Sequence, residues 1–129
     1  MAAVSTSSYG YFGGGEQPGS NPKKSTVDRI DFSNETVSTP FGAGNGLSLE
    51  RSDLAATSNS SYGYFGGGYW PRTDRVDRLD FSNETISDIG DLSQPTSMLA
   101  ACSSNSCGYF GGGGAPGSIC TIDRLDFSN

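Results

Sequence analysis

The sequence has no histidine, and this absence excludes much of the common catalytic and metal chemistry. Ser-His-Asp and Cys-His arrangements need an imidazole base, and most zinc sites use imidazole or a larger set of thiolates. The glycine runs do not indicate phosphate loops either, because no Gly-Lys-Ser/Thr follows them. We therefore expect a protein that is not an enzyme, with no cofactor and no bound metal.

Positive charge is scarce as well. Eight Lys and Arg residues stand against fourteen Asp and Glu, giving a net charge of −6, and no basic cluster is larger than Lys23-Lys24. This balance argues against nucleic acid and anionic membrane surfaces as partners. No apolar run approaches the ~20 residues of a transmembrane helix. The N-terminus lacks the pattern of a secretory signal. We therefore expect a cytoplasmically made protein, a virion protein released by lysis, or a piece of a longer chain.

Cysteine is too sparse for a disulfide framework. Cys102, Cys107 and Cys120 are odd in number and lack a recognised spacing. All three lie in the last third of the chain, at positions that carry other residues in the earlier repeats. This is typical of drift at tolerant positions, and a Cys102–Cys107 or Cys107–Cys120 bridge is the alternative.

Apolar residues make up only 33% of the chain, while glycine is abundant with 19 residues, a composition that would first suggest disorder. Internal repeats argue against it. The motif SYGYFGGG occurs at 8–15 and 61–68, and SCGYFGGGG occurs at 106–114. Each is preceded by Ala-Ala and followed by a DRIDFSN-like block. We divide the chain into repeats 1–53, 54–98 and 99–129, a period typical of propellers, solenoids or arrays.

Each full repeat is predicted to contain four short strands. In the first repeat these are 1–6, 9–12 and 27–32, with a fourth beginning at Thr36 and its counterpart at Thr85. The segments 37–53 and 86–98 are predicted to be long connections. The third repeat ends at Asn129, before a fourth strand. The sequence thus predicts an all-β fold of tandem units.

The order of an aromatic strand, Gly-Gly, a variable loop and a Val-Asp-Arg strand resembles the kelch repeat. The matching residues are Phe65-Gly66-Gly67, Val76 to Phe81, and Arg51 with Ala55-Ala56. The Tyr and Trp that follow the double glycine in kelch repeats are not at their usual spacing, and Phe32, Phe81 and Phe127 are the candidates to replace them. The resemblance implies four-stranded blades, forming a β-propeller or part of one.

The wording GYFGGG followed by DRIDFSN also looks like arrays in structural or tail-fibre-type proteins of marine and cyanobacterial phages. This resemblance implies a virion component that contacts a host surface glycan or protein. An extracellular location is the alternative.

The loop after the second glycine run is the candidate binding loop. It holds the only Trp of the chain, and its candidate residues are Tyr69, Trp70 and Arg72. Variable loops on a repeated scaffold commonly carry binding residues. The alternative is an aromatic residue that covers the edge of a blade.

The Asp-Arg-Ile/Leu-Asp motifs could suggest paired carboxylates for glycoside hydrolysis. Their two Asp residues lie three apart on a strand and face opposite ways, and the motif occurs three times. A calcium site at Asp74, Asp77 and Asp80 lacks the usual ligand spacing. We instead expect ion pairs between blades, formed by Arg29, Asp31, Arg78, Asp80, Arg124 and Asp126.

Three sequons, at Asn34, Asn83 and Asn59, fit the N-glycosylation pattern. A role in turns explains the first two without any glycan.

These features predict a structural or binding module. Three units are too few for a propeller of ~4–8 blades, so we expect partners to be other copies of the chain or further repeats of a longer one. Two chains of three blades could close one ring. The alternatives are a self-assembling extracellular fibre protein, a kelch-like protein-interaction scaffold and a carbohydrate-active propeller.

Overall fold

The computed structural model describes residues 1–19, 22–42, 44–115, 117–118 and 120–128; Asn129, where the third repeat was predicted to end, lies outside them. Within these ranges the chain forms strands and turns but no helix, so it has no helix long and apolar enough to cross a membrane. The prediction of an all-β fold is confirmed.

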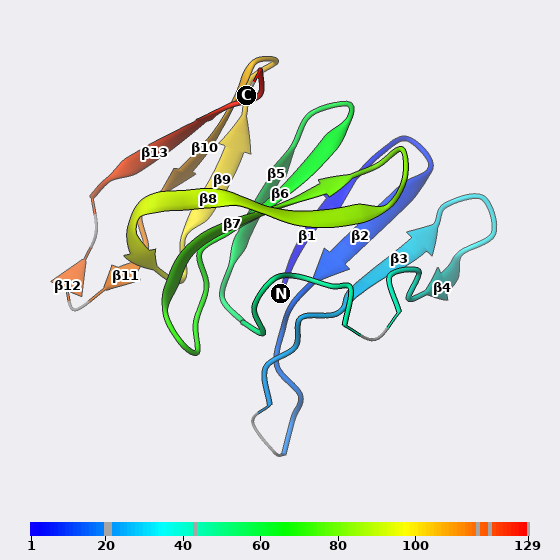
Figure 1. The fold of residues 1–129 in the computed structure, drawn as a ribbon, viewed down its shortest axis with the longest axis horizontal. Coiled ribbons are helices and arrows are strands. Elements are labelled where there is room, and N and C mark those ends of the chain that lie inside the picture. The colour runs from blue at the N-terminus through cyan, green and yellow to red at the C-terminus, as the bar shows by residue number, and fades with distance from the viewer. Residues whose placement is uncertain (20–21, 43, 116, 119, 129) are drawn as a thin grey trace.

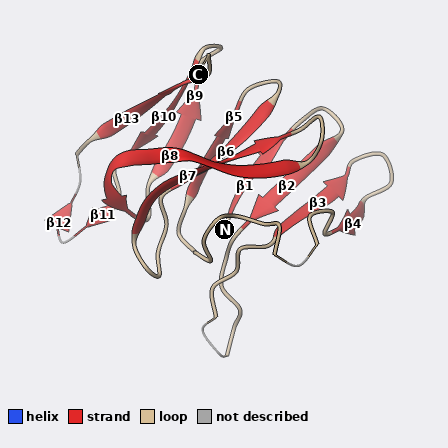
Figure 2. Cartoon of the chain, in the orientation of Figure 1, coloured by secondary structure: helices blue, strands red, loops and turns tan. Residues whose placement is uncertain are grey.

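The strands form three antiparallel sheets that follow one another along the chain (Figures 1 and 2). Sheet 1 contains β1 (Ala2–Ser5), β2 (Tyr9–Gly13), β3 (Val27–Asp31) and β4 (Thr36–Ser38). Sheet 2 contains β5 (Ala55–Ser58), β6 (Tyr62–Gly66), β7 (Thr73–Asp80) and β8 (Thr85–Thr96). Sheet 3 contains β9 (Ala100–Ser103), β10 (Cys107–Gly111) and β13 (Ile122–Asp126), and a short pair is formed by β11 (Gly114–Ala115) and β12 (Gly117–Ser118).

The three sheets share one register, as the sequence repeats require. Tyr11 of β2 lies opposite Arg29. Tyr64 and Tyr109 lie opposite Arg78 and Arg124 in the same way. Positions can therefore be compared from sheet to sheet by their strand pairing.

One connection was predicted wrongly. The segment 86–98 is largely strand, because β8 runs from Thr85 to Thr96. Its partner β7 begins at Thr73, three residues before the predicted Val76, and so offers a longer edge for pairing. The pairing of β7 with β8 shifts register between Val76 and Asp77, which lets the two long strands stay together.

The apolar core lies between the sheets. The first strands β1, β5 and β9 are neighbours in space, so that the sheets stand side by side (Figure 1). One buried cluster joins sheets 1 and 2 and includes Val4, Tyr11, Phe65 and Leu79, together with Phe41, Leu47 and Leu54 of the connection between them. A second joins sheets 2 and 3 and includes Ala55, Tyr64, Val76, Leu92 and Phe110.

Glycine permits the same close contact at both junctions. A Cβ atom on Gly13 would lie 2.8 Å from the ring of Phe65 in the next sheet. A Cβ atom on Gly66 would lie 2.7 Å from the ring of Phe110. Real Cβ atoms do not approach other heavy atoms so closely, so each Phe ring needs a glycine beneath it.

A stacked aromatic pair accompanies each of these contacts. Tyr11 of sheet 1 stacks on Phe81 with ring centroids 5.4 Å apart. Tyr64 of sheet 2 stacks on Phe127 at 5.1 Å. Two successive junctions therefore use the same pairs of positions, and the sequence repeat encodes a repeated interface.

Candidate functional site

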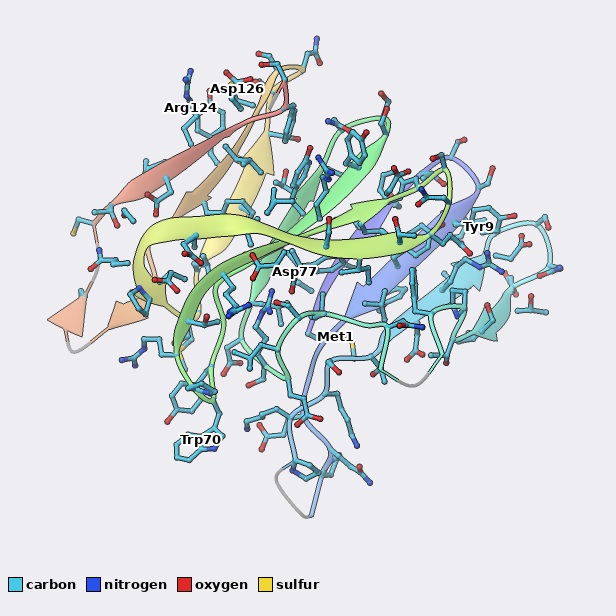
Figure 3. All side chains as sticks on the ribbon, viewed as in Figure 1. Met1, Tyr9, Trp70, Asp77, Arg124 and Asp126 are labelled. Atoms are coloured by element: carbon cyan, nitrogen blue, oxygen red, sulfur yellow. The ribbon has the colours of Figure 1, made fainter. Side chains whose placement is uncertain are left out.

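The loop between β6 and β7 brings the three candidate binding residues together, and Trp70 lies at its outer end (Figure 3). Trp70 is 64% exposed at its tip. The Trp70 ring meets the Tyr69 ring edge-on at 5.5 Å, and the Arg72 guanidinium lies 5.9 Å from the centre of the Tyr69 ring. The surface they form, here called the aromatic loop, presents the Trp70 ring to solvent, with Tyr69 and Arg72 partly buried beside it.

The base of the aromatic loop is fixed to the preceding connection. The Tyr69 amide donates to the Ser52 carbonyl at 2.7 Å, and the Ser52 amide donates to the Tyr69 carbonyl at 2.9 Å. Trp70 has φ of 76°, a conformation that is rare for a bulky residue. Such strain persists where the surrounding structure imposes it, and it is concentrated at binding and catalytic sites. The exposed Trp70 ring thus follows a backbone segment that is fixed by the Ser52–Tyr69 hydrogen bonds.

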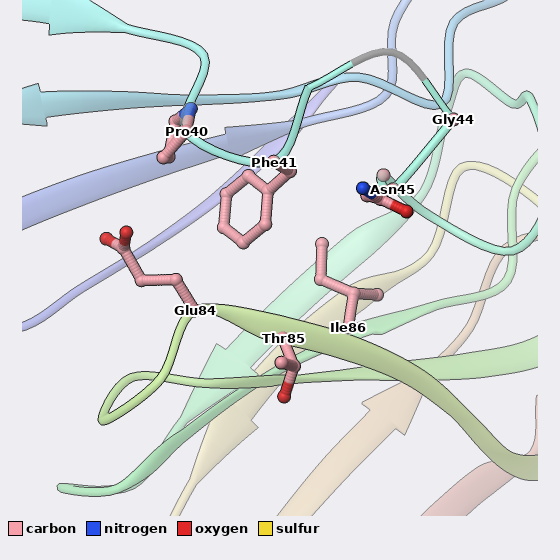
Figure 4. Close-up of a pocket in the computed structure, with 8 residues that line it drawn as sticks. Pro40, Phe41, Gly44, Asn45, Glu84, Thr85 and Ile86 are labelled. Atoms are coloured by element: carbon pink, nitrogen blue, oxygen red, sulfur yellow. The ribbon is translucent and has the colours of Figure 1, made fainter.

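A cavity of about 430 Å³ lies between the connection that follows β4 and the start of β8 (Figure 4). Among its lining residues, Phe41 comes from the connection, whereas Glu84 and Ile86 come from the start of β8 and the turn before it. The cavity was not predicted, because its wall comes from the long connection after Ser38, which carries no repeat motif.

Glu84 is already engaged at the edge of this cavity. Arg29 donates to its carboxylate at 2.6 Å and the Tyr11 hydroxyl donates at 3.1 Å. Burial and the hydrogen bond to Glu84 raise the pKa of Tyr11 to about 12. The hydrogen bond to Glu84 also raises the pKa of Arg29. Glu84 therefore links sheet 2 to sheet 1 through these two hydrogen bonds.

The most deeply buried charges are Arg51 and Asp77, which are both 0% exposed and 2.9 Å apart. Arg51 also donates to the Phe65 carbonyl at 3.1 Å, and the Ser48 amide donates to Asp77 at 3.0 Å. Burial lowers the pKa of Arg51. The pair joins the connection, which carries Arg51, to β7 of sheet 2, which carries Asp77. Because both side chains are shielded from solvent, neither is available to bind a ligand at the surface. The sequence marked Arg51 through the kelch resemblance but did not predict its partner.

The expected Arg–Asp pairs between units are corrected by the structure. Arg29 does bridge two sheets, but its partner is Glu84 and not an Asp. The Arg78 guanidinium lies 4.7 Å from the centre of the Tyr62 ring. Arg124 reaches Asp126 at 3.9 Å, which is a pair within β13 and is open to solvent.

The three Asp residues of these predicted pairs close turns instead. Each stands at the end of its strand and accepts hydrogen bonds from the amide and hydroxyl of the serine two residues later. These bonds lower the pKa of all three carboxyls, Asp31, Asp80 and Asp126. A side chain that caps its own turn is not directed at the next sheet, which explains the error.

The three sequon asparagines also serve turns. Asn34 and Asn83 accept hydrogen bonds from the amide and hydroxyl of the threonine two residues later. Asn59 accepts from the amides of Ser61 and Tyr62. Glycosylation at these positions stays a prediction.

All three cysteines are free, so neither bridge considered as an alternative is present. Cys107 is buried, while Cys102 and Cys120 are exposed. In the described ranges, no three His, Cys, Asp or Glu residues gather in a way that could hold a metal ion.

No protein-family model matches the chain, and no curated protein is significantly similar to it. The resemblances to kelch repeats and to phage arrays therefore stay predictions.

Proposed function

We propose that this chain is a non-enzymatic structural and binding module whose three sheets are successive blades of a propeller-type array. The observation that carries the proposal is the repeated junction: Phe65 rests on Gly13, and Phe110 rests on Gly66. The order of strands within each sheet and the neighbouring first strands agree with blades arranged around a common side.

The binding part of the proposal concerns the aromatic loop. Its ligand is a glycan of a host surface. The exposed Trp70 ring, with the partly buried Tyr69 ring beside it, offers a flat apolar face on which the C–H face of a sugar can pack, and the Arg72 guanidinium supplies hydrogen-bond donors next to them. Fixing the loop at its base reduces the entropy lost on binding.

The location is the phage particle, as a tail-fibre or other appendage component. Only the sequence motifs of the repeats, GYFGGG and DRIDFSN, support this location. Mass spectrometry of washed phage particles should detect peptides of this chain. Their absence from particles that carry complete tails would contradict this location.

Phe110→Ala tests the junction. Phe110 is 2% exposed, so its loss should lower the free energy of unfolding by about 3–5 kcal/mol. Phe12 occupies the same position in sheet 1 but is 41% exposed, and Phe12→Ala should have a much smaller effect on the unfolding of the monomeric chain. Equal effects of the two substitutions would contradict a junction built on this position.

Trp70→Ala tests the ligand. On a glycan array the whole chain should bind a defined set of glycans, and Trp70→Ala should weaken binding about tenfold, which corresponds to ~1.4 kcal/mol. Val37→Ala is the matched control, because Val37 is 69% exposed and lies on β4, outside the loop. Binding to a protein alone, or full binding by the Trp70 variant, would refute the assignment.

A further inference from the structure

The two outer faces of the array are the two halves of the junction that the chain uses internally. The trailing face of sheet 3 is defined by Tyr109, Gly111, Ile122 and Arg124. The counterparts of the first three in sheets 1 and 2 are buried against the next sheet, and Arg29, the counterpart of Arg124 in sheet 1, pairs with Glu84 of sheet 2. The leading face of sheet 1 is defined by Phe12, Phe32 and Glu35. The counterparts of the two Phe residues in sheets 2 and 3 pack on the sheet before, and Glu84, the counterpart of Glu35 in sheet 2, pairs with Arg29 of sheet 1.

Burial shows that the trailing face is an uncovered junction surface. Val27 and Val76 are 0% and 3% exposed, whereas Ile122, at the same strand position, is 72% exposed. The tyrosine position is 1% exposed in both earlier sheets, and Tyr109 is only partly buried. A hollow of about 300 Å³ is lined there by Tyr109, Gly111 and Ile122, together with Ala100, Ala101 and Cys102.

The leading face carries the complementary groups. Phe65 and Phe110 are 0% and 2% exposed because each rests on a glycine of the preceding sheet, while Phe12 is 41% exposed. Phe32 is 50% exposed at the position from which Phe81 and Phe127 stack on tyrosines. Among the described residues, Phe12 on sheet 1 therefore has no glycine of a preceding sheet to pack on, and Gly111 on sheet 3 has no Phe ring of a following sheet above it.

Charge is complementary as well. At the junction of sheets 1 and 2, Glu84 receives Arg29 and the Tyr11 hydroxyl. Glu35 occupies the position of Glu84 on the leading face, in the same turn and with nearly the same φ, 58° against 54°. Arg124 has the position of Arg29, and its side chain is 63% exposed on β13 at the far side of the array (Figure 3).

We infer that a second copy of this chain docks its leading face on the trailing face of sheet 3. Phe12 of the second copy then covers Gly111, its Phe32 stacks on Tyr109, and its Glu35 pairs with Arg124. This inference deepens the proposed function, since it rests on blades that stack through these positions. The contact is head-to-tail, so it leaves a free leading face and a free trailing face on the pair. Such contacts give rings where the rotation closes and filaments where it does not.

The test uses the whole 129-residue chain in sedimentation velocity over a range of concentrations. Wild type should sediment at whole multiples of its 13.4 kDa mass. Phe12→Asp and Ile122→Asp should each sediment as monomers, because each destroys one half of the contact. Trp70→Asp, in the aromatic loop of the central sheet and outside both faces, is the control and should still assemble.

Mixing the two variants gives the decisive result. Phe12→Asp keeps its trailing face and Ile122→Asp keeps its leading face, so an equal mixture should form a single species of two chains and grow no further. Circular dichroism and urea unfolding establish that each variant is folded. A wild-type monomer at all concentrations overturns the inference and points to a further repeat of a longer chain as the natural occupant. Unchanged assembly in either Asp variant, or no pairing in the mixture, also overturns it. In all these cases a large effect of Phe110→Ala would leave the proposed blade packing standing.

Discussion

Removal of the Asp77 carboxylate should be among the most damaging single substitutions in the chain. Asp77→Ala leaves the Arg51 guanidinium, which is 0% exposed, without its counter-charge. The Ser48 amide loses its acceptor at the same time. Breaking a buried pair from one side costs about 3–5 kcal/mol, because an uncompensated charge remains in the interior.

The expected loss from Asp77→Ala is a large share of the total free energy of unfolding. A chain of this size has an unfolding free energy of roughly 6–19 kcal/mol. With a urea m-value of about 2 kcal/mol/M, the substitution should lower the unfolding midpoint by about 1.5–2.5 M. The assay is urea unfolding followed by tryptophan fluorescence and by circular dichroism.

The repeat supplies a matched control. Asp28 holds the same strand position in sheet 1 but is only partly buried, and it accepts a hydrogen bond from Thr39 at 2.8 Å. Asp28→Ala should cost only about 0.5–1.5 kcal/mol. Arg51→Met combined with Asp77→Leu should recover part of the stability lost by Asp77→Ala, since both charges are then absent. Equal losses at Asp28 and Asp77, or a loss below 1 kcal/mol at Asp77, would refute this reasoning.

Two further predictions concern pH. The pKa of Tyr11 is raised from 10.0 to about 12 in the folded chain, so folding favours the neutral phenol. The stability that this contributes is complete below pH 10 and is lost as pH rises towards 12. Tyr11→Phe should flatten the decline in stability over this range, and an unchanged decline would contradict the assignment. The pKa of Asp80 is lowered by hydrogen bonds from Ser82, so its contribution is present above pH ~4 and is lost as pH falls through the lowered value. Ser82→Ala should make the acid-induced loss of stability smaller, whereas Asn105→Ala, in another loop, should leave it unchanged.

The sequence predicted the strands well because its motif repeats in register. Tyr11, Tyr64 and Tyr109 each follow an Ala-Ala strand and precede a Val/Ile-Asp-Arg strand, and the pairing aligns these strands in every sheet. Alternation along such strands gives the faces directly. The extent of β8 could not be predicted in this way, because β8 continues to Thr96 whereas its counterpart β4 ends at Ser38, and the residues from Asp88 onward match no motif of the first repeat.

The polar contacts were harder to predict than the strands. Asp31 and Asp80 were expected to pair with arginines, yet each is satisfied by a serine two residues away. A local hydrogen bond of this kind forms with little loss of chain entropy and so competes with a distant ion pair. The Arg29–Glu84 pair joins residues 55 positions apart, and only the placement of two sheets brings it together.

The most direct measurement of the repeated junction is a double-mutant cycle between Gly66 and Phe110. A Cβ atom on Gly66 would lie 2.7 Å from the Phe110 ring, so Gly66→Ala should cost about 1–3 kcal/mol. In a Phe110→Ala background the ring is gone and the added methyl should be tolerated. We predict that the double variant is more stable than the sum of the single effects by at least ~1 kcal/mol. Additive effects, within ~0.5 kcal/mol, would contradict a junction in which the Phe ring rests on the glycine.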